Sequence, residues 1–380
     1  MTRAPVKPAM LRWARERAGL EFEDLARRFP RLPDWEREQG WPTFKQLEAY
    51  AQATHAPIGF FFLNEPPVER VPIPDFRTAA NKRVEQPSPD LLETIYICQQ
   101  RQDWYRDFAR STHEATLPFV GSLGPGDDVE RSAAKMRDAL NFDLEARRQC
   151  PTWTDALRQF IAQADAAGVL VMVNGVVGNN TRRKLDPDEF RGFALADASA
   201  PLVFINGADT KAAQMFTLAH ELAHLWLGET GISNVEAISE PRQRVEYWCN
   251  RVAAELLAPI ALVREDYRRG EDLRGALDRL ARRFKVSTLV VLRRIHDVGG
   301  LTTQQMWEAY RAELERLRTF TTGGGGNFYL TQSARVGKRL ARALVTSTLE
   351  GQTLHRDAFR LLGISKYATF SGLAHSLGVA

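Results

Sequence analysis

The sequence predicts an α+β fold that is mostly α-helical, with one small sheet flanked by helical modules. Helical periodicity dominates the 380 residues, and apolar runs typical of strands cluster between 169 and 206. These runs follow one helix and precede two others, an order typical of an α+β unit. The length indicates two or three domains, and the 44% of hydrophobic residues suffices for their cores.

Composition narrows the class of protein. The 51 Lys and Arg against 47 Asp and Glu give a net charge of +4, which neither requires nor excludes a nucleic-acid partner. The three cysteines (Cys98, Cys150, Cys249) are far apart and form no disulfide framework or CxxC site, which indicates a reducing compartment. Neither a signal-peptide core nor an apolar run of ~20 residues is visible. We therefore expect a cytoplasmic protein without a membrane partner.

The first 150 residues are expected to be largely helical. Residues 1–64 predict short helices, with Thr43 as the N-cap of one of them. The Pro-rich stretch 65–76 predicts a linker over the surface, and 65–150 as a whole predicts this linker followed by a helical connector.

The strands are expected in the segment 151–265. A helix over 154–167 is followed by predicted strands at 169–173, 190–197 and 201–206, the last two joined as a hairpin. Helices over 212–228 and 244–259 come next. Two helices around Lys285 are predicted within 266–300. A helix over 303–318, a flexible joint at Gly323–Gly326 and a basic helical tail make up 301–380.

The helix over 212–228 carries the pattern His-Glu-x-x-His. His220 and His224 are four residues apart, so they lie on one helix face and can share one metal ion. Glu221 between them can act as the general base toward a water that the metal activates. The surrounding residues are apolar, and burial of these polar groups would be costly without a shared role.

A third metal ligand is expected from a nearby segment. The candidates between 229 and 259 are Glu229, Glu236, Glu240, Glu246, Cys249 and Glu255. Glu246 lies 22 residues beyond His224, which leaves room for a loop and a returning helix. We expect Cys249 to be a small core residue and Glu255 to be a structural carboxylate or one beside the ligands.

AAQMFTLAHELAHLWLG followed by EYWCNRVAAELLAP resembles the ImmA/IrrE family of bacterial metallopeptidases. The resemblance covers about 165–262 and implies a zincin-like core, in which a three-stranded sheet accompanies the HExxH helix. It implies His220, His224 and Glu246 as metal ligands, Glu221 as the base, and Asn250 and Glu255 as matching residues beside them. Cys249 and Val252 depart from the family pattern without removing a ligand.

The ligand set of two histidines and one carboxylate suits Zn²⁺ best and also tolerates Mn²⁺. Proteases with this type of active site commonly hold the substrate backbone on an edge strand. The candidate is the strand at 190–197, with Arg191, Gly192 and Phe193, where Gly192 would let another chain approach closely. An ordinary sheet strand is the alternative.

Residues 1–64 resemble the helix-turn-helix module of XRE-type regulators. Trp35-Glu36, Gly40 and Pro42 match the usual ending of that motif. Two features argue against DNA binding: the segment from Phe29 to Trp35 is short, and the module has 10 basic and 8 acidic residues. We favour a docking or structural role.

Two later segments are more basic and make DNA a candidate partner. Residues 277–299 fit a second helix-turn-helix pattern, and the tail places three arginines at i, i+4 and i+7 on one expected helix face. For 277–299, solvated arginines on packed helices are an equal alternative. For the tail, an acidic partner protein or plain solubility are the alternatives. The nucleic-acid candidates are Arg282, Arg283, Lys285, Arg293, Arg294, Arg335, Arg339 and Arg342.

The predicted function is that of a metal-dependent endopeptidase that cleaves a protein regulator, repressor-like or antitoxin-like. By resemblance, such cleavage belongs to a stress or mobile-element response, and the basic segments suggest activation by nucleic acid. The alternative is a non-proteolytic DNA-binding regulator or antitoxin that uses the peptidase fold as a scaffold. The water-activating Glu221 argues against this alternative, since a scaffold has no need of it.

Overall fold

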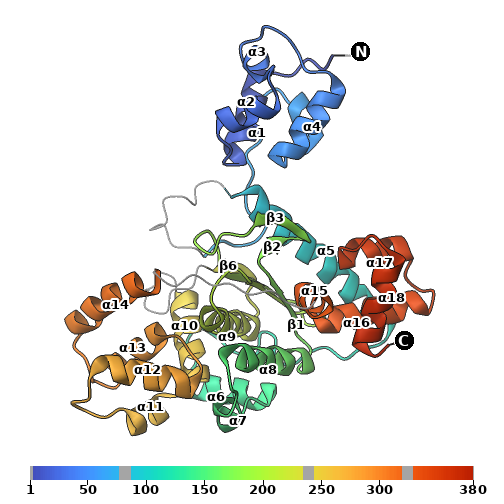
Figure 1. Cartoon of the computed structure of the whole chain (residues 1–380). Coiled ribbons are helices and arrows are strands. Elements are labelled where there is room, and N and C mark those ends of the chain that lie inside the picture. Colours follow the sequence, from blue (N-terminus) through green and yellow to red (C-terminus); the bar gives the residue numbers. More distant parts are fainter. Residues whose placement is uncertain (1–2, 77–86, 234–243, 319–327, 380) are drawn as a thin grey trace. The chain divides into compact units, whose positions relative to one another are not determined.

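The computed structural model describes residues 3–76, 87–233, 244–318 and 328–379. Contacts divide the chain into two compact units, Met1–Pro72 with Lys82–Ile95, and Ile73–Asn81 with Tyr96–Ala380. The second unit contains the sheet (Figure 1). The predicted five-segment division remains a prediction.

The first unit is a small helical domain. It contains α1 (Pro8–Arg17), α2 (Phe22–Arg28), α3 (Leu32–Glu36), α4 (Phe44–Thr54) and the 3-10 helix η1 (Ile58–Phe62). Thr43 caps α4 as predicted, because its hydroxyl accepts from the Gln46 N–H. Tyr50 and Phe61 pack edge to face in its core. At five residues, α3 is short for a recognition helix, and the favoured docking or structural role of this unit remains a prediction.

Helices lead into the second unit. These are α5 (Pro89–Ser111), which continues from the first unit, α6 (Val129–Leu140), α7 (Leu144–Arg148) and α8 (Trp153–Ala166). Asp128 and Thr152 cap α6 and α8 with side-chain oxygens. Phe142 and Phe160 meet edge to face in the main core, so the predicted helical connector contributes to that core.

The sheet has four strands in the order β1-β5-β4-β6. They are β1 (Leu170–Asn174), β4 (Gly192–Leu195), β5 (Leu202–Asn206) and β6 (Gly231–Ser233). The three predicted strands and the hairpin between the last two are confirmed, since β4 and β5 pair antiparallel. The prediction missed β6 and the small β2 (Val176–Val177) and β3 (Asn180–Lys184) hairpin. Three residues are too short a run for alternation to be recognised.

The prediction that 190–197 is an edge strand is wrong. β4 pairs antiparallel with β5 on one side and with β6 on the other, so both of its backbone edges are already hydrogen-bonded. Four consecutive buried residues identify it as a central strand. Within the described residues, β6 lies at the end of the sheet next to β4.

One long helix packs on the sheet and a second packs on this helix. α9 (Lys211–Leu227) contacts β4 and β5, and α10 (Arg244–Leu257) packs along α9. Phe216, Leu222 and Leu256 are among the buried residues of their shared core. This core holds the polar residues of the candidate site in place.

A helical lobe follows in sequence. It consists of α11 (Ile260–Asp266), α12 (Leu273–Phe284), α13 (Thr288–Asp297) and α14 (Thr303–Arg318) (Figure 1). α12 and α13 are joined at Lys285, which adopts a left-handed conformation. Thr288 at the start of α13 is buried and donates to Glu313 of α14. This bond joins α13 to α14, and α13 also packs against α12 and α11.

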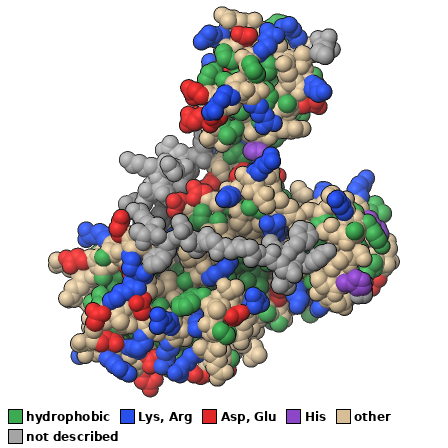
Figure 2. Space-filling model, in the orientation of Figure 1, with side chains coloured by type: hydrophobic (Ala, Val, Ile, Leu, Met, Phe, Trp, Pro, Cys, Tyr) green, Lys and Arg blue, Asp and Glu red, His purple; other side chains and the backbone are tan. Residues whose placement is uncertain are grey.

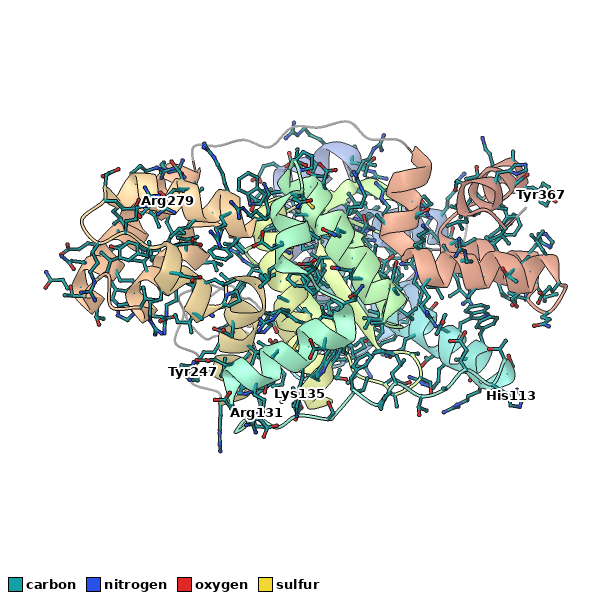
Figure 3. The ribbon with its side chains drawn as sticks, turned by 90° about the horizontal axis from the view of Figure 1, so that it is seen from below. His113, Arg131, Lys135, Tyr247, Arg279 and Tyr367 are labelled. Atoms are coloured by element: carbon teal, nitrogen blue, oxygen red, sulfur yellow. The ribbon has the colours of Figure 1, made fainter. Side chains whose placement is uncertain are left out.

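The chain ends in a second lobe with α15 (Phe328–Val336), α16 (Lys338–Leu349), α17 (His355–Leu362) and α18 (Tyr367–Leu377). Buried Arg101 of α5 donates to the Leu361 carbonyl (2.9 Å) and the Arg335 carbonyl (3.2 Å). These bonds hold the lobe against α5. Tyr367 lies at the outer end of this lobe and Arg279 on the other lobe, at opposite ends of the unit (Figure 3). The predicted joint at Gly323–Gly326 lies outside the described residues.

Candidate metal centre

α9 presents both histidines of the HExxH pattern to the interior. Thr210 caps the helix by accepting from the Ala213 N–H (3.2 Å), and Gly228 ends it in a left-handed conformation. His220, Glu221 and His224 have no exposed surface. Their ordering therefore depends on the apolar residues packed around them.

Glu246 comes to the same point from the first turn of α10. Its Oε1 lies 2.9 Å from His224 Nε2, and its Oε2 lies 3.4 Å from His220 Nε2. The two Nε2 atoms are 3.0 Å apart. Among the described residues, these three side chains form the one group of histidine, cysteine or carboxylate ligands suited to a metal ion.

The distances fit a single divalent cation. Bonds of about 2.0–2.2 Å in a tetrahedral arrangement place ligand atoms roughly 3.3 Å apart. The three measured separations, 2.9, 3.0 and 3.4 Å, lie close to that value. Three protein ligands also leave a fourth position for a water or substrate, as catalytic sites require.

The protonation states agree with a metal-binding role. Burial lowers the pKa of His224, although Glu246 opposes this, so the imidazole is neutral and keeps a free lone pair. Burial alone would raise the pKa of Glu246, but His220 and His224 outweigh it and lower this pKa to about 2. His224 is therefore neutral and Glu246 ionised, which are the forms that bind metal.

Glu221 is the remaining polar residue of the site, and the Nδ1 atoms of His220 and His224 likewise have no hydrogen-bond partner in the described part of the chain. Both carboxylate oxygens of Glu221 are buried, with no hydrogen-bond partner within the described residues. Burial and the nearby Glu246 raise the pKa of Glu221 well above its ordinary value. A buried carboxylate without partners is costly, and a raised pKa is what a general base working near neutral pH needs.

Two residues at the site were missed from the sequence. The Ser233 hydroxyl on β6 lies 3.4 Å from His224 Nε2 and 3.5 Å from Glu246 Oε1. The Phe76 ring stacks on the His224 ring, with centroids 5.5 Å apart and planes 7° apart. Neither residue lies in a periodic segment or a motif, so only the folded chain brings them to the histidines.

Among the described residues, the other candidates for the third ligand do not belong to the ligand group. Cys249 is buried in the core and does not belong to the ligand group. Glu229 is exposed, and Glu236 and Glu240 lie outside the described residues. Glu255 accepts from the Ile260 N–H (3.2 Å) and pairs with buried Arg294, which makes it a structural carboxylate.

Asn250 lies one turn beyond Glu246 on α10. Its side-chain oxygen is buried and has no hydrogen-bond partner within the described part of the chain. Residues four apart share a helix face, so Asn250 points to the same side of α10 as Glu246. Its predicted place beside the ligands is consistent with this arrangement and remains a prediction.

The predicted substrate strand serves the sheet and α9 instead. A side chain at Gly192 would lie 2.6 Å from Thr217 Cγ2 and 3.2 Å from Glu221 Cγ. The space beside Gly192, which was predicted to admit another chain, is thus occupied by α9. Phe193 is buried against Phe204, and Arg191 pairs with Asp209 at 3.3 Å. The predicted role of these residues in holding a substrate backbone does not fit the central position of β4.

Most basic residues of α12 and α13 have partners within the protein. Arg283 pairs with Asp266 (2.5 Å) and Arg293 with Asp297 (3.1 Å). Arg294 is buried and bonds to Glu255 and to the Ala258 carbonyl. Buried Lys285 lies 5.4 Å from the centre of the Trp153 ring. The predicted basic surface is therefore largely built into the packing of the lobe.

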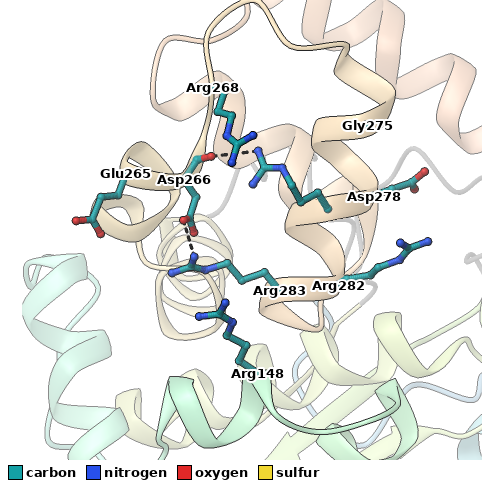
Figure 4. Close-up of a pocket in the computed structure, with 9 residues that line it drawn as sticks. Arg148, Glu265, Asp266, Arg268, Gly275, Asp278, Arg282 and Arg283 are labelled. Carbon is teal, nitrogen blue, oxygen red and sulfur yellow. Dashed lines mark hydrogen bonds and ion pairs between the residues drawn. The ribbon is translucent and has the colours of Figure 1, made fainter.

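Arg282 is exposed and lines a shallow groove with other charged residues (Figure 4). The lining consists of Arg148, Glu265, Asp266, Arg268, Gly275, Asp278, Arg279, Arg282 and Arg283. Side chains of both signs are interspersed over the visible face of this lobe (Figure 2). The groove is therefore mixed in charge, whereas a nucleic-acid surface is expected to be uniformly basic.

The arginines of the tail do not share one helix face. Gly337, with a φ of +85°, ends α15 before α16 begins, so Arg335 lies on a different helix from Arg339 and Arg342. A side chain at Gly337 would also meet the Val171 carbonyl at 2.9 Å. The expectation of one continuous basic face is wrong, because the chain turns at this glycine.

Each of these three arginines also has an internal partner. Arg335 donates to Asn179 Oδ1 (3.1 Å) and Arg342 to the Leu377 carbonyl (2.8 Å). Arg339 donates to the Tyr105 hydroxyl (2.6 Å) and to Glu114 (3.0 Å). These contacts bind the terminal lobe together and to α5.

Comparison with known proteins places the metal centre in a family context. Residues 164–296 match the model of a peptidase family described as the IrrE N-terminal-like domain. Residues 336–376 match a model described as a domain of unknown function. A search of curated proteins found no match.

The family match and the buried ligand group define a metallopeptidase-like domain. The region 164–296 contains His220, Glu221, His224 and Glu246, and its family model supports the resemblance to ImmA/IrrE peptidases. Among the described residues, no helix combines the length and hydrophobicity needed to cross a bilayer.

Proposed function

We propose that this protein is a zinc-type metalloendopeptidase that cleaves a protein regulator. The observation that carries the proposal is the convergence of His220, His224 and Glu246 in the core, with the unpartnered Glu221 beside them. A scaffold would gain nothing from this arrangement, since unsatisfied buried carboxylate oxygens cost stability. Two histidines and one carboxylate are a common catalytic ligand set for zinc, and Mn²⁺ is the second candidate.

His220, His224 and Glu246 would hold the metal, which when bound supplies Lewis-acid activation of water and of the peptide carbonyl. The chain's own part in the reaction falls to Glu221. Its carboxylate takes a proton from the attacking water as the oxygen–carbon bond forms. It then gives this proton to the leaving nitrogen as the carbon–nitrogen bond breaks. The surrounding apolar core holds the carboxylate in place.

The substrate is proposed to be a repressor-like or antitoxin-like protein in a stress or mobile-element response. Support comes from the resemblance to the ImmA/IrrE peptidases, whose members act on such regulators. The appended helical lobes would then control access or recruit the substrate. DNA activation has weaker support, because most of the candidate basic residues are bound internally.

The test is an incubation of the purified full chain with candidate repressor proteins, with and without a chelator. We expect fragments that disappear when the chelator is added and return with Zn²⁺. A protein without metal that cleaves none of them but binds operator DNA specifically would instead support the DNA-binding regulator.

A further inference from the structure

A segment of the chain itself lies along the outer edge of β6. The Phe76 N–H donates to the Ile232 carbonyl, and the Ile232 N–H donates to the Pro74 carbonyl, both at 3.0 Å. Asp75 and Ile232 form a parallel bridge. The stretch Ile73–Phe76 is thus more than a linker, since it adds a short extended segment to the sheet.

These two bonds use the outward-facing backbone groups of β6. Ile232 lies opposite Phe193 of β4 on the inner side, and its own N–H and carbonyl point away from β4 to Ile73–Phe76. An extended peptide that binds to a sheet edge needs outward-facing backbone groups that no other segment has already paired. Within the described part of β6, a second peptide would have to displace Ile73–Phe76.

The same segment reaches the metal ligands. The Phe76 ring stacks on His224 at 5.5 Å, and Gly231 makes room for it, because a Cβ there would overlap the ring. Ser233, the next residue but one on β6, has its hydroxyl 3.4 Å from His224 Nε2. A peptide on this edge is therefore beside the candidate catalytic group.

We propose that the outer edge of β6 is a binding site for an extended peptide with an aromatic side chain, and that Ile73–Phe76 fills it in the resting chain. The ligand class follows from the occupant: main-chain bonds at Ile232, and an aromatic ring on His224 above Gly231. The inference rests on the proposed function, in which a stretch of the substrate is that peptide. As a tethered segment, Ile73–Phe76 acts at an effective concentration on the order of millimolar, so an incoming peptide is at a disadvantage until this segment leaves.

Two variants release the segment by different means. Phe76→Pro removes both the ring and the N–H that bonds to Ile232. Gly231→Ala keeps Phe76 but places a methyl group where its ring lies. Phe62→Ala, at a phenylalanine that is 52% exposed, is the matched control.

The probe is a fluorescently labelled peptide with the sequence Val-Pro-Ile-Pro-Asp-Phe, titrated against the full chain by anisotropy. We expect Phe76→Pro to bind it at least tenfold more tightly than wild type and Phe62→Ala to bind it as wild type does. A peptide ending in Ala should lose at least tenfold in affinity for Phe76→Pro. Gly231→Ala should show no tighter binding, since the place for the aromatic ring is filled.

Hydrogen exchange gives a readout that needs no catalysis. The Ile232 amide should exchange at least tenfold faster in Phe76→Pro and Gly231→Ala than in wild type and Phe62→Ala. Equal peptide affinity in wild type and Phe76→Pro, with unchanged exchange at Ile232, would overturn the proposal. If Phe76→Pro gains peptide affinity but no variant cleaves any protein, the proposed function fails and the peptide site is upheld.

Discussion

The metal centre and the α12–α13 segment both carry closely spaced polar side chains, yet the fold treats them differently. At the centre, Glu221 is buried with both oxygens unpartnered. In α12 and α13, Arg283, Arg293 and Arg294 each pair with a carboxylate of the second unit. The carboxylate at the metal centre is thus left free for chemistry, whereas these arginines are used in the packing of the helices.

The largest expected effect distinguishes the role of Glu221 as the base from the role of His220 as a metal ligand. Glu221→Gln keeps the size of the side chain but cannot accept a proton, so cleavage should fall by about 10²–10⁴-fold with metal content unchanged. His220→Ala should lose both metal and cleavage. Metal analysis and rate measurement on the same preparations check this, and an unchanged rate in Glu221→Gln would refute the assigned role.

The second prediction tests whether the internally paired arginines stabilise the fold. Arg294→Ala leaves Glu255 buried without its partner, so the free energy of unfolding should drop by about 3–5 kcal/mol. Arg282→Ala, at an exposed position, should change it by less than about 0.5 kcal/mol. Urea denaturation measures both. Equal stability of the two variants would show that the internal pairing of the arginines in α12 and α13 contributes little to the free energy of unfolding.

Asp165 extends the comparison, because it is a partly buried carboxylate outside the metal centre whose Oδ1 is buried without a hydrogen-bond partner. Burial raises the pKa of Asp165 to about 7, against the opposing Val171 N–H. The folded state then binds this proton more tightly than the unfolded state. Its stabilising contribution is complete below about pH 4 and is lost as the pH rises through about 7.

The free energy of unfolding should therefore fall between pH 5 and pH 8, by about 3 kcal/mol at most from this group. Asp165→Asn should remove that part of the pH dependence. Asp107→Asn, at an exposed carboxylate, should leave it as in wild type. The same slope in all three proteins would show that Asp165 is ionised in the folded state as in the unfolded state.

Local patterns predicted much of this structure. The helical periodicity, the three apolar strands and the capping of α4 by Thr43 are local features, and all are confirmed. The spacing of His220 and His224 and the helix carrying Glu246 predicted a shared site, and the structure brings these side chains together.

Long-range pairing could not be predicted in the same way. β6 is three residues long, and its partners, β4 and Ile73–Phe76, come from distant parts of the sequence. The basic residues also misled, because Asp266 and Asp297 pair with Arg283 and Arg293 in the folded chain. Gly337 separates Arg335 from Arg339 only through its conformation in the folded chain.

The central claim is that His220, His224 and Glu246 hold one divalent metal ion. The most direct measurement is the metal content per chain of wild type, Glu246→Ala and Cys249→Ala after purification with Zn²⁺ and removal of free ions. We predict one ion per chain in wild type and Cys249→Ala, and a loss of most of it in Glu246→Ala. Full metal content in Glu246→Ala, or loss in Cys249→Ala with Glu246 intact, would contradict the assigned ligand set.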